Sequence, residues 1–136
     1  MIRAFLLALV FTFCAATQAH AISENVGTLY STAGVTATVN GSAFTVPTWA
    51  KACNARLHAV KNSGTTPTLD VKVQHSLDGT TWFDELTFTQ VTTGTSDQIQ
   101  HVNTASTRQL PFVRAALTLG GTTPNFDAAV YFDCER

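Results

Sequence analysis

The stretch 64–86 constrains the fold most, because its pattern predicts two paired β-strands. Apolar and polar residues alternate through 69–76, which is the period of a strand with one buried face. Asp78 and Gly79 then give the sequence of a two-residue type I′ turn, in which both positions need a positive φ. The alternation resumes at Trp82. We therefore predict a β-hairpin, with Asp78 and Gly79 as its turn and Trp82 as its anchor.

A short turn sequence occurs twice in the chain. The letters GTTP run from Gly64 to Pro67 and again from Gly121 to Pro124. Each copy stands between two alternating stretches, so a unit of strand, GTTP turn and strand is used twice. Two copies at this separation favour two similar hairpins in one sandwich over a solenoid. We accordingly predict Gly64, Pro67, Gly121 and Pro124 as structural turn residues.

The rest of the chain is predicted to consist of short strands separated by turns, with no amphipathic helix of useful length. Abundant threonine and valine favour pleated structure. The expected fold is an all-β antiparallel β-sandwich of eight to ten short strands, immunoglobulin-like or jelly-roll in style. The expected strands outside 64–86 are an arm or short strand at 22–32, a hairpin of 35–39 and 44–46 around Asn40-Gly41, and strands at 53–62, 86–91, 97–102, 112–119 and 126–134.

Residues 1–21 have the organisation of a secretory signal peptide. A short basic start with Arg3 precedes an apolar run over 4–16, and an A-x-A site ends at Ala21. The apolar run is too short for a transmembrane helix. We expect cleavage after Ala21, which leaves one domain, 22–136, with no membrane contact in its mature form and a secreted or periplasmic location. A retained hydrophobic N-terminal arm is the alternative.

Two cysteines, Cys53 and Cys134, fall in that domain, and export makes a disulfide possible. Each cysteine is in phase with the buried positions of its strand. Cys53 precedes one GTTP by nearly the same distance as Cys134 follows the other. If both turns lie at one end of the sandwich, the two sulfur atoms therefore reach a similar height. We predict a Cys53–Cys134 bridge, and two buried thiols are the alternative.

The charge of the chain bears on its partners. The formal net charge is −1 and charged residues make up only 12% of the sequence. There is no basic cluster, which argues against nucleic acid or an anionic membrane as a partner. The low charged fraction and the open edges of a sandwich favour contacts between copies, so we expect a homo-oligomer.

The histidine and carboxylate side chains, which are the types that carry out chemistry, are better explained as structural residues. His75 is in the buried phase of its strand, and the histidines lack the spacing of metal ligands. Asp78 is accounted for by its turn. Together with Asp84 and Glu85 it surrounds the hairpin, whereas a glycosidase needs two carboxylates facing each other across a cleft. We therefore expect no catalytic residue, no metal site and no cofactor.

Three stretches together resemble small β-sandwich proteins encoded among the virion genes of tailed bacteriophages. They are GTTPTLDVKVQHSLDGTTWFD, LTFTQVTTGT and LPFVRAALTLGGTTPNFDAAVYF, and the resemblance covers roughly 41–132. Such proteins are head-decoration, head-fibre-like or other capsid-associated components. The resemblance implies capsid or other virion proteins as partners, a place on the virion surface and no catalytic residues. Virion proteins do not normally carry a signal peptide, so it also implies either a prophage-derived domain recruited for export or a hydrophobic attachment arm.

Two functions are expected as alternatives. The first is a non-enzymatic virion structural protein, a capsid decoration or fibre-like module that docks on a capsid or on neighbouring copies. The second is a secreted or periplasmic β-sandwich module that binds glycans or a cell-surface partner. The signal peptide favours the second, as does the discoidin-like S-x-D-G-x-x-W hairpin at 76–82. This hairpin resembles the Asp-box of sialidases but is one residue short between its aspartate and its tryptophan. In that case Trp49 and Tyr30 are the candidate ligand contacts.

Overall fold

The computed structural model describes residues 23–102 and 111–135, and the regular structure in that part is entirely β. Every described pairing between named strands is antiparallel. The expected leader lies outside the described residues. The strands are β1 (Ser23–Val35), β2 (Val39–Asn40), β3 (Phe44–Thr45), β4 (Cys53–Ser76), β5 (Phe83–Thr87), β6 (Thr95–Val102) and β7 (Phe112–Glu135).

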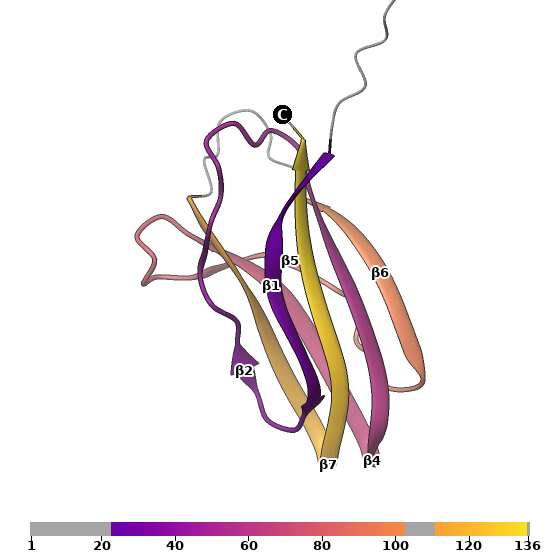
Figure 1. Ribbon diagram of the computed structural model, residues 1–136. Helices are drawn as coiled ribbons and strands as arrows, with labels where there is room; N and C mark the ends of the chain where they lie inside the picture. The colour runs from indigo at the N-terminus through magenta and orange to yellow at the C-terminus, as the bar shows by residue number, and fades with distance from the viewer. Residues whose placement is uncertain (1–22, 103–110, 136) are drawn as a thin grey trace, which may run out of the picture.

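Two strands of 24 residues, β4 and β7, form the frame of the molecule. They pair along their whole length, from Cys53 opposite Cys134 to Ser76 opposite Phe112. Both strands bend sharply near their middles, so a single seven-stranded sheet folds into two layers (Figure 1). The predicted all-β antiparallel fold is confirmed. The short strands expected on either side of each GTTP are halves of one long strand. When these halves are counted separately, the number of strands falls within the predicted eight to ten.

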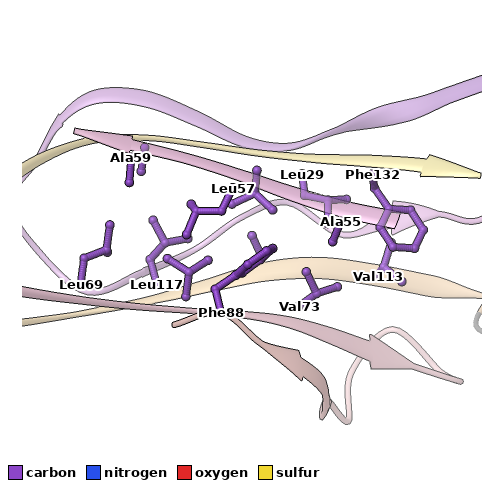
Figure 2. Close-up of a cluster of buried hydrophobic side chains, with 14 of the residues drawn as sticks. Leu29, Ala55, Leu57, Ala59, Leu69, Val73, Phe88, Val113, Leu117 and Phe132 are labelled. Atoms are coloured by element: carbon purple, nitrogen blue, oxygen red, sulfur yellow. The ribbon is translucent and has the colours of Figure 1, made fainter. Parts of the chain in front are cut away.

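Each layer contains one half of each long strand. The first layer has the order β6, first half of β4, second half of β7, β1. The second layer has the order β5, second half of β4, first half of β7, and β2 and β3 pair with this half of β7. Apolar side chains from both layers meet between them (Figure 2). The large, fully buried ones are Leu57, Phe126, Val130 and Phe132 in the first layer and Leu69, Val71, Val73, Val113 and Leu117 in the second.

The two GTTP segments are corners inside the long strands, so the prediction of two GTTP hairpins is wrong. Thr65 pairs with Thr122, which places the two copies opposite each other. Thr66 and Thr123 both have a φ of 48°, and they are the only described residues other than glycine with a positive φ. The pairing register shifts at the corner because the strands leave the extended conformation there. Glycine, threonine and proline in this order signal a break in a strand, and a corner needs that break as much as a hairpin does.

The two corners fit against each other in a reciprocal way. A Cβ atom on Gly121 would lie 2.3 Å from the carbonyl oxygen of Thr66, and one on Gly64 would lie 2.9 Å from that of Thr123. The two glycines have φ values of 87° and 120°. Glycine alone combines these φ values with so close an approach of two backbones. The repeat therefore arises because two strands bend at one place, around Gly64, Thr66, Pro67, Gly121, Thr123 and Pro124.

Asn40 and Gly41 do not close a hairpin, contrary to the prediction. The strands on either side of them, β2 and β3, both pair with β7 and so follow one another along the same neighbour. Gly41 lacks the positive φ of a type I′ turn. It is required for a close approach instead, since a Cβ atom there would lie 2.3 Å from the carbonyl oxygen of Leu29.

The predicted disulfide is confirmed. Cys53 and Cys134 lie directly opposite each other on β4 and β7, and their Cα atoms are 4.1 Å apart. Both residues are buried. The bridge closes the first layer at the end next to the C-terminus, and the GTTP corner closes it at the other end (Figure 1). The two long strands are therefore held together at both ends of this layer.

Candidate functional site

The loop 77–82 joins β4 to β5 and contains the residues predicted as a two-residue turn. The type I′ turn is wrong, because the connection is longer and Asp78 has no positive φ. Asp78 acts through its side chain: Oδ1 accepts the backbone N–H groups of Thr80 and Thr81 at 2.8 and 2.7 Å. Gly79, with a φ of 74°, changes the direction of the chain. One carboxylate thus organises the whole loop.

These hydrogen bonds hold the pKa of Asp78 far below its ordinary value. The largest effects come from the backbone N–H groups of Thr81 and Thr80, followed by the side chains of Thr80 and Ser76. A carboxylate that accepts several hydrogen bonds is stabilised in its charged form. The Ser76 hydroxyl oxygen in turn accepts the N–H of Gly79 at 2.8 Å, which connects the loop to the end of β4.

Replacing Asp78 by asparagine is expected to flatten the acid side of the stability profile. Because the folded-state pKa is lowered, the contribution of Asp78 is present above its unfolded-state value of about 4 and is lost as the pH falls below it. The Asp78→Asn variant keeps an acceptor oxygen but does not titrate. Urea unfolding at a series of pH values should therefore show a steeper acid loss in the wild type. Parallel curves for the two proteins would contradict this role of Asp78.

Trp82 lies half-buried at the end of the loop, beneath the guanidinium group of Arg114 on β7. The Cζ atom of Arg114 is 4.3 Å from the centroid of the indole ring, within the range of a cation–π contact. The Nε of Arg114 also donates to the Oε1 of Gln74 on β4 at 2.9 Å. Trp82 therefore contacts the frame through a polar surface contact and is only partly buried.

The outward-facing side chains beside this contact are engaged with one another. Asp84 accepts hydrogen bonds from the Nζ of Lys72 at 2.6 Å and from the Nε2 of Gln74 at 2.8 Å. The bond from Lys72, followed by that from Gln74, lowers the pKa of Asp84. Such partly exposed pairs contribute little to stability. Because these groups already satisfy each other, they are weak candidates for ligand contacts.

His75 is buried, as its phase predicts. Its Nδ1 lies 3.0 Å from the Oε2 of Glu85, and its ring stacks on Phe83 with the centroids 5.7 Å apart. Glu85 reaches the histidine from β5, where the pairing register with β4 shifts. Each of the three carboxylates expected around the hairpin thus has its own structural partner.

Trp49 and Tyr30, the candidate ligand contacts, are both half-buried and pack against the core. Tyr30 lies in β1 opposite Val130 of β7, and Trp49 lies in the segment between β3 and β4. Part of each ring is therefore used for packing. Neither residue lines the groove on the outer face of the first layer, which is described next.

The outer face of the first layer carries a groove of about 240 Å³, called the outer groove below. Three of its residues form a row across three strands. Arg56 on β4 lies directly opposite Ile99 on β6 and directly opposite Tyr131 on β7. The remaining lining residues are Leu57, His58, Asp97 and Gln98.

Three polar side chains of the outer groove, those of Arg56, His58 and Asp97, each have a polar partner. The Nε of Arg56 donates to Oδ2 of Asp133 at 2.9 Å, and its Cζ lies 5.5 Å from the centroid of the Tyr131 ring. The Nδ1 of His58 and the Oδ1 of Asp97 are 2.6 Å apart. A ring and paired charges of this kind provide contacts for a partner surface or a sugar.

Comparisons with known proteins add no assignment: no family model, no curated protein and no solved structure matches this chain. Within 23–102 and 111–135, no group of three or more histidine, cysteine, aspartate or glutamate side chains is placed to hold a metal ion. The described part has no helix long and apolar enough to cross a membrane. The candidate site is therefore defined by surface features.

The most informative of these features were missed by reasoning from sequence. Among the described residues, the exposed large apolar side chains are Leu77 at 70%, Ile99 at 63% and Phe83 at 54%. The sequence predicts a strand at 97–102 but does not assign Ile99 to either face. Arg56 and Tyr131, the neighbours of Ile99, were not predicted, because alternation along one strand does not tell which strand lies beside it.

Proposed function

We propose that this chain is a non-enzymatic structural protein, a capsid decoration or fibre-like module that docks on a bacteriophage capsid or on neighbouring copies. The observation that carries the proposal is the exposure of Ile99, Phe83 and Leu77 on or next to β6 and β5, at the edges of a cross-linked frame. Exposed apolar side chains and open sheet edges are features of contact sites.

The rigidity of the frame supports this proposal. The strands β4 and β7 pair over their full length, and the first layer is closed by the disulfide at one end and by the GTTP corner at the other. A surface held in one conformation loses little entropy when it docks. The choice of a capsid as the assembly comes from the resemblance of the sequence to virion proteins of tailed bacteriophages.

The protein content of purified particles tests this proposal. Particles released from the host that encodes the chain are banded on a density gradient and digested with trypsin, and the peptide 115–136 is quantified against the major coat protein. We expect a fixed ratio of the two proteins across the particle band. Recovery of the chain from the periplasm or the medium, with none in the particles, would refute the virion role.

Glycan binding is the second candidate, because the outer groove places the Tyr131 ring beside Arg56 and next to a histidine–carboxylate pair. An aromatic ring with flanking polar groups is a common composition of sugar sites. If the particles do not contain the chain, the purified protein and its Tyr131→Ala variant are each tested on a glycan array. Binding that the variant loses would support the second candidate over the first.

A further inference from the structure

We propose that the open edge of β6 pairs with β6 of a second copy, antiparallel and centred on Ile99. In this register Ile99 lies opposite its own counterpart, and Asp97 lies opposite His101 of the partner subunit. The first layers of the two molecules then form one continuous sheet. This inference rests on the part of the proposed function that concerns neighbouring copies, and it identifies the strand responsible.

The first argument is that β6 has the longest regular edge of the described strands at the rim of a layer. Its eight residues pair with β4 without a register shift, and among the described residues it pairs with β4 alone. The other outer strands are blunted. β1 has three register shifts, β5 has five residues and a shift, and β2 and β3 have two residues each. Bulges and short lengths hinder pairing between sheet edges, whereas a regular edge permits it.

The second argument concerns the direction of the backbone groups. The N–H of Lys61 on β4 donates to the carbonyl oxygen of Gly94 at 2.9 Å, just before β6 begins. In an antiparallel ladder, hydrogen-bonded positions alternate along each strand. The N–H and C=O groups of Asp97, Ile99 and His101 therefore point to the open edge. Pairing centred on Ile99 gives each of these three residues a hydrogen-bonded partner.

The third argument is that the side chains of β6 are self-complementary. The segment 97–101 reads Asp-Gln-Ile-Gln-His, which places an acid opposite a base on both sides of the central isoleucine pair. Within one molecule Asp97 contacts His58 and His101 contacts Asn54 through one ring nitrogen. Ile99 is 63% exposed and the Asp97 side chain is still 74% exposed, so both remain accessible for further contacts with a second copy. Opposite residues of an antiparallel pair share one face of a sheet. A two-fold axis through Ile99 satisfies all of these contacts at once.

Cysteine cross-linking in the purified full-length chain tests the register. Only position 99 lies opposite itself, whereas the two copies of position 97 would be four residues apart along the strands, about 13 Å. Under a mild oxidant, Ile99→Cys is expected to form a covalent dimer about tenfold faster than Asp97→Cys or His101→Cys alone. A mixture of Asp97→Cys and His101→Cys should give the mixed dimer at a rate close to that of Ile99→Cys.

A proline variant tests the edge itself. Ile99→Pro removes an N–H that points away from β4, so the fold and its unfolding midpoint should be retained while sedimentation shifts from dimer to monomer. In the control, Gln98→Pro removes an N–H that points toward β4 and should destabilise the fold. A wild type that stays monomeric at about 0.1 mM, or equal cross-linking at positions 97 and 99, would overturn the proposal. A dimer that is absent from particles would overturn the virion role alone.

Discussion

Replacing Cys53 and Cys134 together by alanine is expected to lower the free energy of unfolding by about 4–5 kcal/mol. The bridge joins residues separated by 81 positions, so it removes much of the loop-closure entropy of the unfolded chain. Net stabilities of domains are typically about 5–15 kcal/mol, so this loss is a large share of the total. The two tryptophans are both half-buried, and their fluorescence during urea titration measures the change.

The reduced wild type is the control for this measurement. It contains the same side chains as the oxidised protein, so it separates the effect of the cross-link from the loss of two buried sulfur atoms. The alanine pair and the reduced wild type should both unfold well below the oxidised protein. A difference of less than about 1 kcal/mol between oxidised and reduced wild type would show that pairing of β4 and β7 holds without the bridge.

The sequence was sufficient to predict the class of fold and the disulfide. Alternation over 69–76 identified a half-buried strand whose buried phase includes His75, and the structure buries these positions. Cys53 and Cys134 share the buried phase of their strands and lie at nearly equal distances along the chain from the two GTTP segments. These two observations predicted that the sulfur atoms lie at a similar height. Both inferences use distances along the chain, and a strand converts such distances directly into positions in space.

The errors have a common physical cause. A glycine-rich break at Gly64 or Gly121 gives the same signal whether the chain reverses within its sheet or bends into the next layer. Which of the two occurs depends on the strand that pairs on the far side of the break, and this is a long-range property. The same limit hid the outer groove, since the neighbours of Arg56 come from 43 and 75 positions further along the chain at Ile99 and Tyr131.

Replacing Gly121 by alanine is expected to destabilise the protein by about 3–4 kcal/mol. The new Cβ atom would lie 2.3 Å from the carbonyl oxygen and 2.8 Å from the carbonyl carbon of Thr66, and the φ of 87° is itself unfavourable for alanine. Both contacted atoms belong to the backbone of the opposite strand. No side-chain rotation can relieve the clash, so the corner must open. Urea unfolding of the oxidised variant measures the loss.

A series of three glycines separates the clash from the backbone conformation. At Gly94 the φ is 59° and a Cβ atom would meet nothing within 4 Å, so Gly94→Ala should cost only about 1 kcal/mol, from the conformation alone. At Gly64 the φ of 120° is also unfavourable for alanine and the nearest atom would be the carbonyl oxygen of Thr123 at 2.9 Å, so Gly64→Ala should fall between the other two. Equal losses at Gly94 and Gly121 would mean that the corner yields without cost. The expected order would instead show that the repeated GTTP exists because two bent strands must approach each other there.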